Sequence, residues 1–176
     1  MKNWMHYAAL ALLLAGCTKD NPELNTEPTP PDLAVADRAP SVPFSASYET
    51  RPKIVAPPPF LGLEIPGEGK GLHLGKSTWF SNSTVDVTVF PFQQTGTMTF
   101  TAADGSTLAG HFAGIAVPVP DPHHRVNFNG EYWITGGTGR FNGATGNGTY
   151  NGEAALDNLN PGTVGTGNVG FQGVLN

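Results

Sequence analysis

Cysteine is almost absent from this chain of 176 residues, which contains Cys17 and no other. A single cysteine cannot form a disulfide within the chain, and an exposed free thiol is a liability in an oxidising compartment. We therefore expect Cys17 to have a chemical use of its own. The rest of the chain offers no thiolate nucleophile and no sulfur ligand for a metal, so its stability must come from packing.

Charged residues are also scarce, at 13% of the chain, and basic residues are the rarer kind. The chain has 9 Lys and Arg against 14 Asp and Glu, a net charge of −5 at pH 7. This balance gives no basic surface for nucleic acid or for anionic lipid head groups. The low charged fraction argues against a disordered protein, and the length suffices for one domain with a sizeable core.

A hydrophobic run long enough to span a bilayer is missing as well. The apolar run Ala8–Leu14 follows Lys2 and is shorter than the roughly 20 residues that a membrane helix needs. A charged start, a short apolar run and small residues are typical of a signal peptide, here residues 1–16. The motif Leu-Ala-Gly-Cys at residues 14–17 resembles the lipobox of bacterial lipoproteins, which implies cleavage before Cys17 and lipid on its sulfur.

The lipobox resemblance implies attachment to a membrane, whereas an ordinary secretory signal with an incidental cysteine is the alternative. Stable anchoring needs more than one acyl chain, at about 0.8 kcal/mol per buried CH₂, and a multiply acylated Cys17 would supply this. Thr18 rather than Asp follows the cysteine. By resemblance to lipoprotein sorting rules, this favours the outer membrane.

Proline is concentrated in residues 17–59, where bulky apolar residues are few. Such a composition favours extended conformations and cannot bury enough surface to offset the loss of conformational entropy. The sequence therefore predicts a Pro-rich tether between the lipid and the folded domain. A Pro-rich ligand for a partner domain is one alternative, and an extra strand through Val42, Phe44 and Tyr48 is another.

From Phe60 onward the chain changes to Gly, Thr, Val and aromatic residues in alternating apolar and polar segments. This alternation predicts half-buried strands, and Ala103–Ser106 is a turn signal between two of them. No window keeps a helical apolar period, so almost no helix is expected. Candidate strands cover residues 84–89, 97–102, 108–112, 125–135, 141–150 and 164–175.

About eight short strands at meander spacing predict one all-β domain over residues 60–176, either an eight-stranded antiparallel β-barrel or a sandwich. Glycines within the strands favour the barrel, because tight coiling needs residues without a Cβ. An eight-stranded barrel has room for a side-chain core or for one small ligand.

Two stretches resemble a known family. Residues 132–146, Tyr-Trp-Ile-Thr-Gly-Gly-Thr-Gly-Arg-Phe-Asn-Gly-Ala-Thr-Gly, are similar to the late hairpin of allene oxide cyclase and dirigent-like barrels. Residues 69–76, Gly-Lys-Gly-Leu-His-Leu-Gly-Lys, resemble the opening strand of uncharacterised bacterial relatives. The resemblance covers about residues 60–176 and implies a calycin-like barrel.

The activities in that family differ. Allene oxide cyclases isomerise a fatty-acid epoxide in an apolar cavity, whereas dirigent proteins orient phenoxy radicals without being full enzymes. The catalytic positions of the plant cyclases have no residue-by-residue match here, and the predicted domain lacks cysteine. The resemblance therefore implies a fold more than a chemistry.

The glycine-rich turn has a physical explanation of its own. Gly136, Gly137 and Gly139 can adopt a positive φ at no steric cost, and Phe141 can plug one end of a barrel. We expect these four residues to be structural.

Candidate site residues are ionisable or aromatic side chains on the strand faces. Glu131 shares a face with Trp133, and inside a barrel it would serve as a base or an orienting acceptor. His73 and His111 interrupt otherwise small or apolar strand faces and are further catalytic candidates. Candidates for ligand binding are Trp133, Glu64 and Phe112. The face opposite Glu131 looks more like core and carries Val126, Phe128, Tyr132 and Ile134.

Two motifs suggest a cofactor or a metal at first sight. Gly165–Gly170 fits G-x-G-x-x-G, but too few residues follow it for the helix of a dinucleotide site. Asp121, His123 and His124 lie in a Pro-flanked loop, where adjacent histidines point apart in extended chain, so a solvated loop is preferred to a metal site. We expect neither a cofactor nor a metal.

Three functions remain open. The leading one is a lipid-anchored barrel that binds a small apolar ligand without turnover. The second is an isomerase or cyclase-like enzyme that uses a buried Glu or His, and the third is a surface interaction module with a filled barrel. Inward side chains with room beside them would distinguish the first two, and an exposed apolar patch is expected of the third.

Overall fold

The computed structural model describes residues 40–120 and 125–176. The predicted signal peptide, Cys17 and most of the predicted tether lie outside these residues, as do Asp121, His123 and His124. In the part of the chain that the structure describes, no helix has the length and apolar character needed to cross a membrane.

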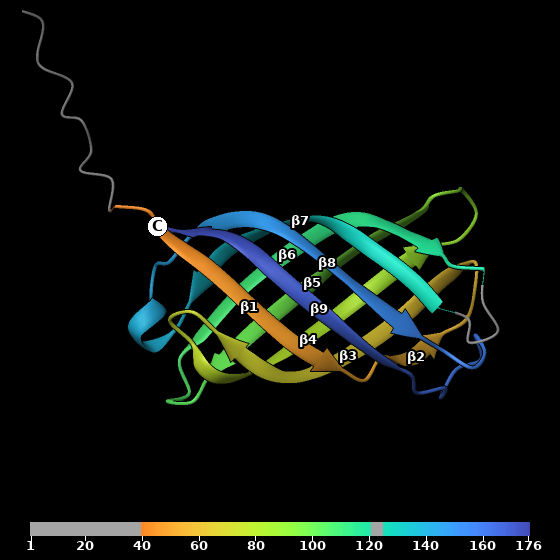
Figure 1. Cartoon of the computed structure of the whole chain (residues 1–176), viewed down its shortest axis with the longest axis horizontal. Helices are drawn as coiled ribbons and strands as arrows, with labels where there is room; N and C mark the ends of the chain where they lie inside the picture. Colours follow the sequence, from red (N-terminus) through yellow and green to blue (C-terminus); the bar gives the residue numbers. More distant parts are fainter. Residues whose placement is uncertain (1–39, 121–124) are drawn as a thin grey trace, which may run out of the picture. The chain divides into compact units, whose positions relative to one another are not determined.

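The described chain forms a closed antiparallel β-barrel of eight strands with one extra strand (Figure 1). Each strand from β2 to β8 pairs with the next one along the chain, and β1 pairs with both β3 and β9 to close the barrel. The predicted all-β barrel is therefore confirmed. The strands are β1 (Val42–Thr50), β2 (Lys53–Ala56), β3 (Phe60–Gly71), β4 (Gly75–Asp86), β5 (Phe92–Ala102), β6 (Thr107–Pro118), β7 (Arg125–Gly137), β8 (Gly146–Ala155) and β9 (Thr166–Leu175).

The barrel begins at Val42, before the predicted boundary at Phe60. Inside the Pro-rich segment, Phe44 and Tyr48 alternate with exposed residues and are buried to 2% exposure. Pro52 falls in the break between β1 and β2, where no strand needs its missing N–H. The tether prediction is therefore wrong for residues 42–56, and the alternative of an extra strand applies to β1.

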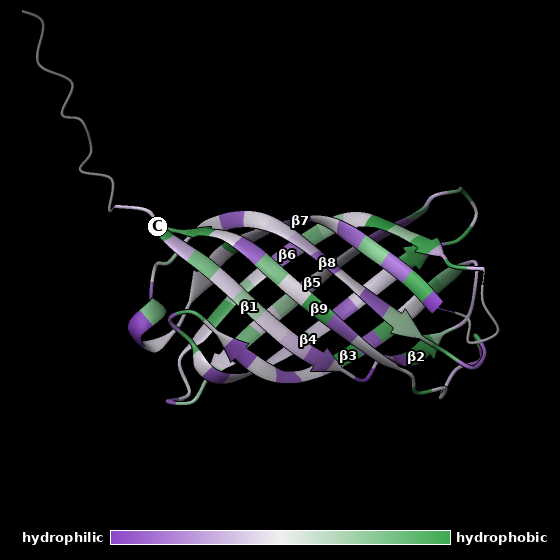
Figure 2. Ribbon diagram, viewed as in Figure 1, coloured by the Kyte–Doolittle hydropathy of each residue, from purple (hydrophilic) through white to green (hydrophobic). Residues whose placement is uncertain are grey.

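Alternation along the strands separates the interior from the surface (Figure 2). In β4, for example, Trp79 and Val85 are buried while Phe80 and Thr84 are exposed. In β7, Tyr132 and Ile134 are buried, as the apolar face of the sequence suggests. The interior is thus made by one face of every strand.

Aromatic rings fill most of this interior. Phe171 meets Phe100 edge to face with ring centroids 5.0 Å apart, and Phe44 meets Phe100 at 5.6 Å. Such edge-to-face contacts stabilise aromatic pairs beyond the area they bury. The buried aromatic residues of this cluster are Phe44, Tyr48, Trp79, Phe100, Phe112, Tyr132, Phe141, Tyr150 and Phe171.

Inward-facing glycines make room for these rings. A Cβ at Gly114 would lie 2.5 Å from the Tyr150 hydroxyl and 2.2 Å from the Asn129 carbonyl oxygen. A Cβ at Gly96 would meet the ring of Phe112 at 2.6 Å. The strand glycines therefore allow an aromatic ring to lie directly on the backbone of the barrel wall.

Candidate binding site at the open end of the barrel

The two ends of the barrel are built differently. We call the end with the β3–β4, β5–β6 and β7–β8 turns the closed end. The open end carries the loops at residues 57–59, 87–91 and 156–165. Figure 1 shows the closed end on the left, beside the short helix η1 (Gly139–Phe141), and the open end on the right.

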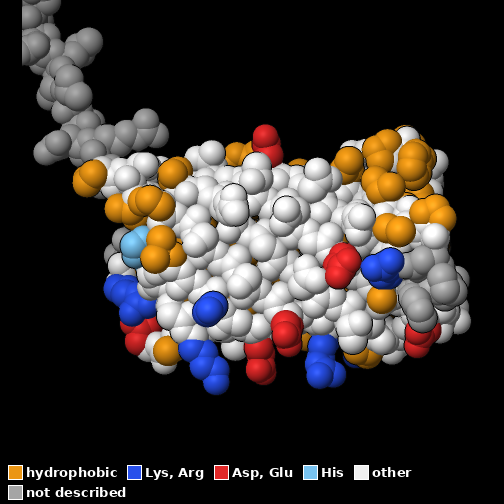
Figure 3. All heavy atoms as spheres, viewed as in Figure 1, with side chains coloured by type: hydrophobic (Ala, Val, Ile, Leu, Met, Phe, Trp, Pro, Cys, Tyr) orange, Lys and Arg blue, Asp and Glu red, His pale blue; other side chains and the backbone are white. Residues whose placement is uncertain are grey.

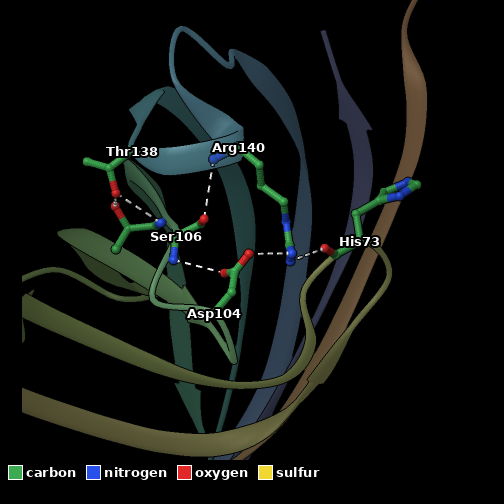
Figure 4. A network of polar contacts seen from close by, with 6 residues as sticks. His73, Asp104, Ser106, Thr138 and Arg140 are labelled. Carbon is green, nitrogen blue, oxygen red and sulfur yellow. Dashed lines mark hydrogen bonds and ion pairs between the residues drawn. The ribbon is translucent and has the colours of Figure 1, made fainter.

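Three turns are joined by polar contacts at the closed end (Figure 4). The Arg140 guanidinium contacts the Asp104 carboxylate at 2.6 Å and donates to the His73 carbonyl oxygen at 2.8 Å. The Asp104 carboxylate also accepts the backbone N–H of Ser106, which holds the pKa of Asp104 below its usual value with help from the Arg140 charge. One arginine thus connects all three turns.

Apolar side chains fill the space under this network. Phe141 lies buried in η1, with the Arg140 guanidinium carbon 4.8 Å from the centre of its ring. Leu74, from the β3–β4 turn, is 2% exposed in the same cluster. Both side chains therefore belong to the buried core at this end.

The glycine-rich turn uses its glycines in two ways. Gly139 has a φ of +60°, and a Cβ there would lie 2.3 Å from the Ser106 hydroxyl. Gly136 and Gly137 are not among the described positive-φ residues, because they are the last residues of β7. At Gly137 the constraint is space, since a Cβ would lie 2.5 Å from the Thr107 carbonyl oxygen.

At the open end, the inward side chains line a cavity of about 520 Å³, which we call the outer cavity. This volume is within the range of small-molecule sites. The walls come from the starts of β3, β5 and β7 and from the ends of β4, β6 and β8, and charged groups are confined to Arg125 and Asp157 among the described lining residues. Its apolar lining includes Leu61, Leu63, Val85, Phe92, Ala116, Val126, Phe128 and Leu156.

Exposed apolar side chains continue outward from the outer cavity onto the loops around it. Phe90 is 70% exposed in the β4–β5 loop with its ring 6.1 Å from that of Phe92, and Leu159, which lines the cavity, is 46% exposed. Figure 3 shows hydrophobic side chains gathered toward the ends of the barrel, with few on the strands between. An apolar molecule reaching this mouth therefore meets apolar surface before it enters.

A second, smaller cavity of about 30 Å³ lies against the outer one, and we call it the inner cavity. Residues that line both cavities are Pro52, Ile65, Gln94, Phe128 and Ala154. Trp79 and Tyr150 are added to the lining of the inner cavity. Its volume is close to that of one water molecule, so it can hold one small chemical group.

Gln94 is the polar residue shared by the two cavities, and its side chain is 6% exposed. Its amide nitrogen donates to the Ser83 hydroxyl at 3.1 Å, and its amide oxygen accepts from the Tyr150 hydroxyl at 3.3 Å. Burial raises the pKa of the Tyr150 phenol well above its usual range. Tyr150 therefore stays protonated and can keep donating to Gln94 at neutral pH.

Most candidates from the sequence lie away from these cavities. Glu131 is exposed on the outer face of β7, and its neighbours Tyr132 and Gly130 point inward. His111 and Trp133 pair across β6 and β7 on the outside, with their rings stacked at 5.2 Å. The interior position considered for Glu131 is wrong, because Tyr132 and Ile134 occupy the buried face of the strand.

The remaining candidates divide between surface and interior. His73 lies in the β3–β4 turn with a φ of 67°, and its Nε2 is 3.0 Å from the Pro43 carbonyl oxygen. Glu64 lies on the face of β3 opposite the buried Leu63. Phe112 points inward, lines the inner cavity and meets the Tyr150 ring at 5.3 Å.

Sequence reasoning missed Gln94 and Trp79. Gln94 precedes Gly96, Met98 and Phe100 at alternate positions, so the period already placed it on the inward face. A polar glutamine on an otherwise apolar inward face was therefore the signal in the sequence that could have identified it. Trp79 likewise lies at every second position with the buried Ser77 and Ser81, so the same period places it on the inward face of β4.

A larger depression of about 850 Å³ runs along parts of β1, β3, β4, β8 and β9. It is lined by charges of both signs, including Glu49, Arg51, Glu68 and Glu153. Such a lining does not favour an apolar ligand. The outer cavity is therefore the better candidate site despite its smaller volume.

Within residues 40–120 and 125–176, no three His, Cys, Asp or Glu side chains lie close enough to hold a metal ion. Comparison with protein-family models, with curated proteins and with solved structures finds no match to this chain. The argument for function therefore depends on the geometry of the barrel.

Proposed function

We propose that this protein is a lipid-anchored barrel that binds one small apolar molecule in its outer cavity without chemically changing it. The observation that supports this most directly is an apolar cavity of about 520 Å³ at one end of an otherwise filled barrel. Apolar walls favour a ligand that gains free energy by leaving water.

The membrane part of the proposal is supported by the sequence alone. The short apolar run and the Leu-Ala-Gly-Cys motif favour export and lipid on Cys17, with the outer membrane as destination. A Cys17→Ser chain is expected to stay unacylated and to partition into water where the parent partitions into detergent. Equal partitioning of the two chains would contradict the anchor.

The barrel is compatible with the resemblance to allene oxide cyclase and dirigent-like proteins, which remains part of the proposal. The alternative of a cyclase-like enzyme is weaker, because Glu131, His73 and His111 all lie outside the cavities. An interaction module would use the apolar rim instead. It differs from the proposed function in predicting no bound small molecule.

The cavity can be tested by filling it. Ala116 is 3% exposed, points inward from β6 and lines the outer cavity, so Ala116→Trp would place an indole where the ligand lies. Ala113→Trp is the matched control, because Ala113 is on the opposite face of the same strand, across from Glu131. Both changes are made in the full chain carrying Cys17→Ser.

The readout is the fluorescence of the neutral apolar probe N-phenylnaphthylamine during titration. We expect saturable binding by the parent chain, loss of binding in Ala116→Trp and unchanged binding in Ala113→Trp, with thermal melting showing that each variant folds. Binding that survives in a folded Ala116→Trp would place the probe elsewhere. Absence of binding by the parent would contradict the proposed function.

A further inference from the structure

The inner cavity differs in chemistry from the outer cavity beside it. Both cavities have mainly apolar walls, but the polar residues of the outer one include the charged Arg125 and Asp157, whereas those described at the inner one, Thr50, Trp79, Gln94 and Tyr150, are uncharged. A polar group at the deep end of an apolar site fixes the orientation of a ligand more than it adds affinity.

Gln94 has unused hydrogen-bonding capacity in this position. A primary amide can donate two hydrogen bonds and accept two, and the described contacts of its side chain use one of each, with Ser83 and Tyr150. The Trp79 indole N–H is buried and has no partner among the described residues. That N–H is out of reach of a water-sized group in this arrangement, so the group available to an incoming oxygen is the amide of Gln94, which lines both cavities.

We propose that the ligand is an uncharged amphiphile with a long apolar body and one hydroxyl or carbonyl oxygen at one end, bound with that end in the inner cavity against Gln94. This inference rests on the proposed function, because it takes the outer cavity to hold the apolar body. It adds the class of ligand and its direction of entry.

The end of the ligand that enters the inner cavity is inferred to be neutral, because no charged side chain is described in the lining of that cavity. None of the described residues that line the inner cavity is ionised at neutral pH, whereas Arg125 and Asp157 lie at the outer one. A carboxylate or an ammonium group buried without a partner would lose its hydration uncompensated. The Gln94 amide can donate to a carbonyl oxygen through its N–H, and it can donate to or accept from a hydroxyl.

The size of the inner cavity limits the inserted end to one small group. About 30 Å³ is the share of one water molecule in the liquid, so an oxygen with its carbon fits and a sugar or phosphate does not. The larger part of the ligand must remain in the outer cavity of about 520 Å³.

The test compares ligands that differ only at one end. A primary alcohol, the hydrocarbon of the same chain length and the corresponding carboxylic acid each compete with N-phenylnaphthylamine for the full Cys17→Ser chain. Gln94→Met removes the amide and keeps its length. Gln93→Met is the matched control, because Gln93 is the exposed neighbour on the outer face and donates to the Pro91 carbonyl oxygen.

We expect Gln94→Met to weaken the alcohol about three- to tenfold, the effect of one neutral hydrogen bond, and to leave the hydrocarbon unchanged. Gln93→Met should change neither, and the acid should weaken as it ionises. Equal effects on alcohol and hydrocarbon would overturn the inference while the proposed function stands. Tight binding of the ionised acid, independent of Gln94, would also overturn it.

A second measurement needs no variant and decides the case if Gln94→Met fails to fold. A long-chain aldehyde bound to the parent chain should show its carbonyl stretch at lower frequency than in hydrocarbon solvent, because a hydrogen bond weakens the C=O bond. An unshifted band would mean that the oxygen has no donor and would overturn the inference. If no ligand or probe binds the parent chain, the proposed function itself fails.

Discussion

The closed and open ends of this barrel are made by the same strands, yet one is filled and the other is hollow. Toward the closed end, rings such as Phe44, Phe100 and Tyr132 meet each other and leave little space. At the open end the buried apolar side chains are aliphatic or small, as at Leu63 and Ala116. Leu63 and Ala116 belong to a smaller apolar cluster of this end and line the outer cavity of about 520 Å³.

This difference shows how a single strand pattern can supply both stability and a site. Close packing of large rings gives the filled half most of the apolar burial that holds the barrel together. The hollow half retains apolar surface that no described side chain covers, and a ligand can gain the same free energy by covering it. Stability and binding are thus placed in separate halves of the barrel.

The largest expected effect comes from removing a ring in the filled half. Phe100 is fully buried and contacts Phe44, Tyr48 and Phe171, so Phe100→Ala should lower the free energy of unfolding by about 3–5 kcal/mol. Phe92→Ala, at the partly exposed mouth, should cost less. Denaturant unfolding of both variants checks this, and equal losses would remove the distinction between the halves.

Alkaline pH should also act on the filled half. Burial raises the pKa of Tyr48 and of Tyr132 to about 12, against 10.0 for a free phenol. Because the folded state holds these protons more tightly, the tyrosines stabilise it fully below pH 10, and this contribution is lost as the pH rises toward 12. Phenolate absorbance should rise together with unfolding. Ionisation near pH 10 in a folded barrel would contradict the burial.

A smaller effect is expected at the closed-end turn. Gly139→Ala forces an L residue into φ +60° and places a Cβ against Ser106, so stability should fall by about 1–2 kcal/mol. Gly136→Ala is the control, since a Cβ there meets nothing within 4 Å. Thermal melting of both variants measures the difference. If Gly136→Ala cost as much, the positive φ would not be the reason.

The sequence predicted the barrel because alternation and in-strand glycines are local signals. It misplaced the start because the prolines around β1 hid the alternation of Phe44, Ala46 and Tyr48. It also left open which face of β7 is buried, and there Tyr132 rather than Glu131 points inward. The face with the large apolar side chains is the buried one, and the face with Glu131 is exposed.

The cavity itself could not be predicted from alternation. Whether inward residues fill a barrel depends on which rings meet across it, and those pairs come from distant strands, as with Phe44 and Phe100. The role of Gln94 depends in the same way on Tyr150, which comes from another part of the chain. Such contacts follow from closure of the barrel and have no local signature.

The most direct test of the central claim is native mass spectrometry of the protein purified from the cell in which it is naturally made, followed by organic extraction. The account predicts one neutral, largely apolar molecule per chain, which is released on extraction and is missing from the Ala116→Trp variant. A mass equal to that of the chain with its covalent modifications alone, persisting after incubation with lipid extracts of the same cell, would contradict a binding barrel.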